Sequence, residues 1–181
     1  MPGGFPLGLE ICNQTTSGAI AVTAGTTANT LGAFTAIFAS TAHDACFLKI
    51  DLAGFSADGP DGAVDIAVGA AASEVVIIQQ LMTSFNSTAG NSKTTYLLPV
   101  SIPSGTRVSA RCQIDHASDN LDVTVTLYDG AFTMVEGFSG VDSIGFTAAT
   151  TLGTQVDPGA VANTKGAYAQ LTASTARDYA G

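Results

Sequence analysis

Apolar and polar residues alternate along several short stretches of this chain, and this alternation limits its possible folds more than any other feature. In CFLKIDLAG, residues 46–54, the residues Leu48, Ile50 and Leu52 occupy every second position. Successive side chains of an extended strand point to opposite faces, so this spacing gives one apolar and one polar face. Helical periodicity is nearly absent. We therefore predict a fold built from half-buried strands.

Three further stretches alternate in the same way and supply the other inner rows of the predicted core. Their apolar positions are Val64, Ile66 and Val68; Val108, Ala110, Cys112 and Ile114; and Val123, Val125 and Leu127. Residues 74–84, EVVIIQQLMTS, suit either a fully buried strand or a short helix, and their β-branched run favours the strand. Turn-forming Asp, Asn, Gly and Pro separate these stretches. We predict an all-β fold, an antiparallel β-sandwich of jelly-roll-like type with eight or nine strands.

The chain carries nearly the same sequence twice. Residues 31–44 read LGAFTAIFASTAHD and residues 165–178 read KGAYAQLTASTARD, with seven of the fourteen positions identical at an offset of 134. The repeat predicts the start of a second tandem copy of the domain. A lone strand cannot fold by itself. Either the natural chain continues, which we favour, or residues 163–181 add a strand to a neighbouring subunit.

These features divide the chain into three predicted parts. Residues 1–28 are irregular and rich in Pro and Gly, and we expect them to form an N-terminal attachment arm that orders on binding. Residues 29–150 form the sandwich domain. Residues 151–181 form a linker and the first strand of the second repeat.

Composition excludes several classes of protein. The net charge of −9, with only six basic residues, argues against nucleic acid as a partner. No apolar run approaches the ~18 residues that span a membrane, and the first 16 residues lack the pattern of a secretory signal. The three cysteines, Cys12, Cys46 and Cys112, are odd in number and have no CxxC spacing. Cys46 and Cys112 lie in apolar strand patterns and are interpreted as buried reduced thiols, so we expect a protein assembled in a cytoplasm. Charged residues make up only 12% of the chain, which favours burial of its surface in an assembly.

Two acidic loops are candidate metal sites. The loop SADGPDGAVD contains Asp58, Asp61 and Asp65, but its spacing departs from an EF-hand, and turn formation explains its Asp-Gly pairs without calcium. Whether Asp58 and Asp61 bind calcium is left open. The second loop is interpreted as solvated, because one histidine without a second placed ligand is a weak metal site. Its candidate residues are Asp115, His116, Asp119, Asn120 and Asp122.

The candidates for catalysis are weak. Ser139 lies in GFSGV, which lacks the final Gly of a nucleophile elbow, and nothing places His43 or His116 beside a serine. No phosphate-binding loop occurs. We therefore predict that the chain is not an enzyme and has no catalytic, cofactor-binding or metal-binding residues.

Two other sets of residues are candidates for binding. Arg107 and Arg111 share one strand face, where they either contact a partner subunit or pair with Asp51 or Asp65 on a neighbouring strand. Tyr96 and Tyr128 are the plausible residues for stacking on a sugar, with the loops 86–95 and 115–121 as alternative contact sites for a glycan.

Two stretches resemble segments of structural proteins of tailed bacteriophages, in β-rich modules of fibres and other virion-surface parts. They are AVDIAVGAAASEVVI, residues 63–77, and YLLPVSIPSGTRVSARCQ, residues 96–113. The resemblance implies a virion component that assembles in the host cytoplasm as a symmetric homo-oligomer, with a trimer favoured. No family site residue can be matched to this sequence.

Together these observations predict a non-enzymatic virion structural protein, either a capsid decoration or part of a tail or head fibre. It would contact other virion proteins through the N-terminal arm. The alternatives are a carbohydrate-binding module that recognises a host surface glycan and a surface adhesin with stacked sandwich repeats.

Overall fold

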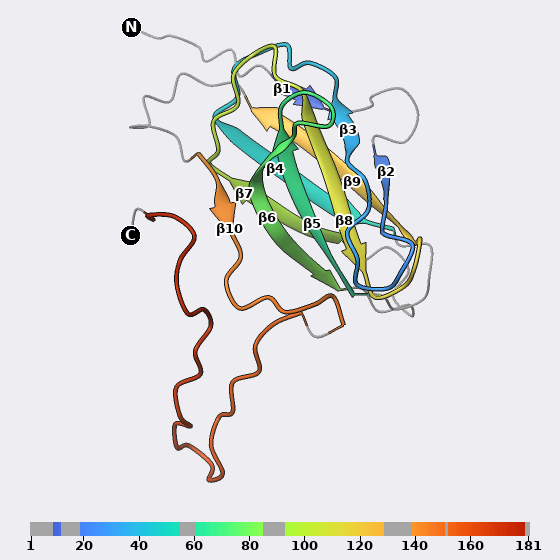
Figure 1. The fold of residues 1–181 in the computed structure, drawn as a ribbon. Coiled ribbons are helices and arrows are strands. Elements are labelled where there is room, and N and C mark those ends of the chain that lie inside the picture. The colour runs from blue at the N-terminus through green and yellow to red at the C-terminus, as the bar shows by residue number, and fades with distance from the viewer. Residues whose placement is uncertain are drawn as a thin grey trace, which may run out of the picture.

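The structure is a computed structural model that describes residues 9–11, 19–54, 61–84, 93–128, 139–150 and 152–179. Ten strands and no helix occur in these ranges. The strands form two five-stranded sheets that face each other (Figure 1). This arrangement confirms the predicted all-β sandwich.

The first sheet is antiparallel throughout and has the order β1-β9-β4-β7, with β2 also paired to β9. Its strands are β1 (Leu9–Ile11), β2 (Ile20–Thr23), β4 (Phe47–Ala53), β7 (Lys93–Leu98) and β9 (Asn120–Tyr128). The seven residues of β4 pair with β9 on one side, and six of them pair with β7 on the other. The strongest alternating stretch of the sequence is therefore a central strand.

The second sheet has the order β10-β6-β5-β8-β3 and is antiparallel except for the short parallel pair of β10 and β6. Its strands are β3 (Thr35–Phe38), β5 (Asp61–Val68), β6 (Val75–Ser84), β8 (Val108–Ile114) and β10 (Val141–Asp142). Residues 75–84 form a strand, as their β-branched run predicted.

The core lies between the sheets and contains the predicted inner rows. Leu48, Ile50 and Leu52 of β4 are fully buried and belong to the same cluster as the inner row of β8. The rows of β5 and β9 belong to the same cluster, and Val68 packs against its edge. Burial of these alternate side chains is the main source of stability for such a sandwich.

A bulge interrupts the pairing of β5 with β6. Ile66 pairs with Ile78 and Val64 with Leu81, so two residues of β6 lie opposite the single residue Asp65 of β5. Gln80 takes a φ of 55° there, and its backbone N–H donates to the Asp65 carboxylate at 2.9 Å. The carboxylate thus satisfies a donor that the bulge removes from the ladder.

The sandwich begins before the predicted boundary at residue 28. Strand β2, Ile20–Thr23, pairs with β9, and the side chains of Val22 and Ala24 are buried in the core. The predicted attachment arm therefore contains a structural strand. This strand was missed because four residues are too short to give a clear alternating signal.

The segment after β10 leaves the sandwich as an extended chain and then returns, and its end lies near β10 (Figure 1). The repeat predicted a first strand of a second domain in this region, but residues 152–179 contain no strand. A strand requires a partner for its backbone groups, and this segment has none within the described chain.

The core can be tested by truncation of a central side chain. We expect Ile50→Ala to lower the free energy of unfolding by about 2–5 kcal/mol, because it leaves a cavity between the sheets. Leu97→Ala on β7 is the matched control: Leu97 is exposed, so a change within about 0.5 kcal/mol is expected. Denaturant unfolding measures both values, and equal losses would contradict this account of the core.

Candidate functional site

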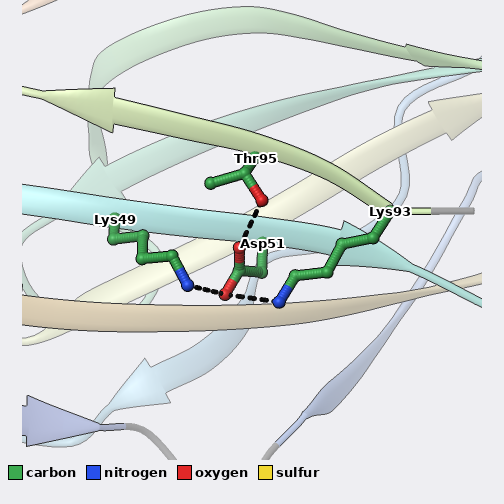
Figure 2. A network of polar contacts seen from close by, with 4 residues as sticks. All are labelled: Lys49, Asp51, Lys93 and Thr95. Atoms are coloured by element: carbon green, nitrogen blue, oxygen red, sulfur yellow. Dashed lines mark hydrogen bonds and ion pairs between the residues drawn. The ribbon is translucent and has the colours of Figure 1, made fainter.

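The outer face of the first sheet carries a cluster of polar contacts centred on Asp51 (Figure 2). Lys49 Nζ and Lys93 Nζ lie 2.7 and 2.9 Å from Asp51 Oδ2, and Thr95 Oγ1 donates to Oδ1 at 2.7 Å. Thr95 lies directly opposite Asp51 in the register of β4 with β7. The two lysines remain partly exposed, whereas the Asp51 side chain is only 8% exposed.

Opposing effects set the pKa of Asp51. Its desolvation raises the pKa, but hydrogen bonds from Lys49, Thr95 and Lys93 outweigh desolvation and hold the pKa below 3.8. The hydrogen bond to Asp51 also raises the pKa of Lys49. The cluster therefore keeps its charges at neutral pH and satisfies them internally, as expected of a structural ion pair rather than an acid or base catalyst.

The outer face of the second sheet carries the two arginines that the sequence singled out. Arg111 Nε lies 2.9 Å from Asp65 Oδ2 on the neighbouring strand, one of the pairings expected, and its guanidinium lies 4.6 Å from the Phe34 ring centroid. Arg107 pairs instead with Glu74 at 2.8 Å, a partner that sequence reasoning missed. Both arginines are thus engaged within the module.

The acidic loops do not form a metal site within the described residues, where no group of three His, Cys, Asp or Glu side chains is suitably placed. Asp58 lies outside those residues. His116 Nδ1 contacts Asp115 Oδ1 at 2.8 Å on the surface, while Asp119 Oδ1 accepts from the Asn120 N–H at 2.7 Å. Asp122 lies on β9, opposite Ala21 and Ala53.

The remaining candidates are also separate in the structure. Within the described chain no hydrogen bond joins Ser139 to His43 or His116. The Tyr96 hydroxyl donates to the Met82 carbonyl oxygen on the opposite sheet, and burial raises the pKa of Tyr96. Tyr96 therefore links the two sheets and packs, partly buried, against the core. Tyr128 ends β9, and residues 86–92 of the first candidate glycan loop lie outside the described residues.

The part of the chain after β10, described over residues 143–150 and 152–179 and here called the C-terminal segment, exposes more large apolar side chains than the sandwich does. Among the residues that the structure describes, six of the nine exposed large apolar residues lie between residues 144 and 179. They are Ile144, Val156, Val161, Tyr168, Leu171 and Tyr179. Val156, Tyr168 and Leu171 line an open groove of about 530 Å³ whose walls are two limbs of this same segment. A concentration of exposed apolar surface of this kind is typical of an interaction site.

The end of this segment is fixed to the sandwich through Asp142 of β10. Arg177 Nη2 lies 2.7 Å from Asp142 Oδ1, and the Tyr179 hydroxyl donates to the other carboxylate oxygen. This hydrogen bond, together with desolvation, raises the pKa of Tyr179. The groove is therefore held on a loop that is anchored at both ends.

Comparison with known proteins adds no relative: no family model, curated protein or solved structure matches this chain. Among the residues that the structure describes, no helix has the length and hydropathy needed to cross a membrane.

The groove of the C-terminal segment was not predicted as a site. The sequence signal that points to it is the repeat.

The Asp51 cluster predicts a pH dependence of stability. The folded state lowers the pKa of Asp51. The carboxylate therefore stabilises the fold at pH values above its pKa in the unfolded chain, near 4, and this stabilisation is lost as the pH falls through its lower pKa in the folded state. We expect Asp51→Asn to cost about 1–3 kcal/mol at pH 7 and to flatten the loss of stability in acid. Asp178→Asn, at an exposed position, is the matched control. Unfolding curves of wild type and Asp51→Asn that stay parallel from pH 7 to pH 3 would contradict this role.

Cys112 offers a test of burial at β8. Burial, aided by the charge of Asp119, raises the pKa of its thiol to about 12. Alkylation requires the thiolate, so at pH 8 we expect native Cys112 to react about a thousandfold more slowly than an unperturbed thiol. Iodoacetamide labelling followed by peptide mass mapping measures this rate, with the denatured chain as control. Equal rates in the native and denatured chain would show that β8 is not enclosed.

Proposed function

We propose that this chain is a non-enzymatic structural protein of a tailed-phage virion, a module of the capsid surface or of a tail or head fibre. It acts by attachment and assembly. The observation that carries the proposal is the concentration of exposed apolar side chains on the C-terminal segment, outside a sandwich whose lysines and arginines are paired with carboxylates. A surface of this kind becomes stable in water when another protein covers it.

The strand order is consistent with this role. The strands β2 to β9 lie in the orders β2-β9-β4-β7 and β3-β8-β5-β6, so the chain passes repeatedly from one sheet to the other. This is the order of a jelly roll, an architecture found in viral capsid proteins and in lectins. The likeness is one of fold alone, and it supports the virion proposal together with the resemblance of residues 63–77 and 96–113.

The same fold also supports a second candidate function, a carbohydrate-binding module that recognises a host surface glycan. With Tyr96 used inside the sandwich, such a site would be formed by loops. A glycan array separates the two candidates: a module that only assembles gives no hits, and a specific hit that is lost on loop substitution establishes the alternative.

Assembly is tested by the mass of the purified protein in solution and by its binding to phage particles. We expect a homo-oligomer, with a trimer favoured, in light scattering coupled to size exclusion, and co-sedimentation with virion proteins. A protein that stays monomeric at millimolar concentration and binds no virion component would contradict the proposal.

A further inference from the structure

The C-terminal segment repeats the backbone of the sandwich as well as its sequence. Residues 22–44, here called the first corner, join β2 to β3 and thus carry the chain from one sheet to the other. Residues 156–178, the second corner, are their counterparts at an offset of 134. The pattern of turns and bends is the same at residues 26–30 and 160–164, and again at 39–44 and 173–178.

The tight turn in each corner has the same geometry. Asn29 has a φ of 61° and Asn163 a φ of 62°. In both corners the following threonine donates twice to the carbonyl oxygen three residues before it. The N–H distances are 3.2 Å in both corners, and the hydroxyl distances are 2.5 Å for Thr30 and 2.6 Å for Thr164.

A glycine permits the two limbs of each corner to approach. A Cβ on Gly32 would lie 1.9 Å from the Thr23 carbonyl oxygen, and a Cβ on Gly166 would lie 2.0 Å from the Asp157 carbonyl oxygen. Thr23 and Asp157 are themselves counterparts at the same offset. The two corners therefore share this turn and this close approach, which requires glycine at the position of Gly32 and Gly166. They differ at the preceding glycine: the Gly25 N–H donates to the Thr30 carbonyl oxygen, whereas Gly159 has a φ of 104° and its N–H donates to the Asp157 carboxylate.

In the first corner this structure binds residues 102–118, here called the corner-binding surface, which comprise a turn and strand β8. Besides Val22 and strand β3, which pairs with β8, five further residues of the first corner make backbone or side-chain hydrogen bonds to this surface. The Gly25 carbonyl oxygen accepts from the Ser118 N–H, and the N–H groups of Asn29 and Gly32 donate to the carbonyl oxygens of Ile114 and Cys112. Thr41 forms hydrogen bonds with Pro103, Gly105 and Thr106. The Asp44 carboxylate accepts from the Ser104 N–H.

All five of these residues are identical in the second corner. Their counterparts are Gly159, Asn163, Gly166, Thr175 and Asp178. Within the part of the chain that the structure describes, the Gly166 N–H and the Thr175 hydroxyl have no hydrogen-bond partner. The second corner thus retains the groups that bind a corner-binding surface and lacks the surface itself.

The groove of the second corner marks the missing partner. In the first corner the space between the two limbs is occupied by β8: Cys112 Sγ donates to the Val22 carbonyl oxygen at 3.2 Å, and the Cys112 carbonyl oxygen accepts from Gly32 at 2.9 Å. Val22 and Ile37 are consequently buried. Their counterparts Val156 and Leu171 are 55% and 51% exposed.

Some residues differ between the corners. Pro158 replaces Ala24 and cannot donate the bond that Ala24 makes to Asp119, and Thr172 replaces the core residue Phe38. Arg177 replaces His43 and forms the ion pair with Asp142. The second corner therefore lacks some groups that the first corner uses, and it is anchored to its own sandwich through Asp142.

We propose that the second corner is a docking element whose partner is the corner-binding surface of a second copy of this chain, where it takes the place of that copy's own first corner. Docking places Leu171 in the core of that copy and Tyr168 over its Arg111, where Phe34 lies in the first corner. The proposal rests on the assembly function proposed above, to which it adds the partner and the surface.

The test uses full-length chains with different affinity tags that are co-expressed in pairs. Two acceptor chains are used, and both carry Gly166→Val, which disables their second corner. One also carries Gly32→Val and the other Phe38→Thr, each of which weakens the first corner. The Phe38→Thr acceptor retains its first-corner glycine, so its backbone can still fold. The donors are the wild-type chain, the Gly166→Val chain and, as matched control, a chain with Gln170→Ala at an exposed position whose counterpart is Ala36.

We expect tandem purification and native mass spectrometry to recover a donor–acceptor complex with the wild-type and Gln170→Ala donors. Its yield should fall at least about tenfold with the Gly166→Val donor. Recovery of no complex from either acceptor with the wild-type donor would overturn the proposal, and so would equal yields from all donors. Equal yields would mean that the subunits assemble through another surface. Failure of the proposed assembly function would appear differently, as a wild-type chain that stays monomeric and binds no virion protein.

Discussion

The sandwich depends on β8, the strand that binds both β5 and the first corner. Its inner residues Val108, Ala110, Cys112 and Ile114 are fully buried, and its outer edge accepts hydrogen bonds from the turn that carries the chain between the sheets. A strand that is hydrogen-bonded to a neighbour on each side fixes the register of both neighbours. The corner is thus a docking element within the module, and its repetition in the C-terminal segment gives that segment a defined partner.

Basic side chains are few, and almost all of them are paired with carboxylates within the module. Five of the six basic residues form ion pairs with acidic side chains, among them the pairs of Lys49 and Lys93 with Asp51 and of Arg111 with Asp65. Because these cations are already paired, they do not form a patch for an acidic partner. The surface that remains for recognition is the apolar groove of the second corner, which agrees with a function in assembly.

The sequence predicted the features that depend on local periodicity. The inner rows of β4, β5, β8 and β9, and the strand at residues 75–84, follow from alternation and β-branched residues. Strand β2 was missed because it is short, and the bulge at Gln80 because it depends on a carboxylate from another strand. The pairing of Arg107 with Glu74 depends on a turn that brings distant residues together. The repeat revealed the second corner, but its groove required the three-dimensional structure.

The central claim is that the second corner docks on β8 of another module. The most direct measurement is a high-resolution electron cryo-microscopy map of the assembled protein. The account predicts that Leu171 is buried beside β8 of a neighbouring module and that the Gly166 N–H bonds to its backbone. An assembled form in which Val156 and Leu171 stay exposed to solvent, with the subunits joined through other surfaces, would contradict it.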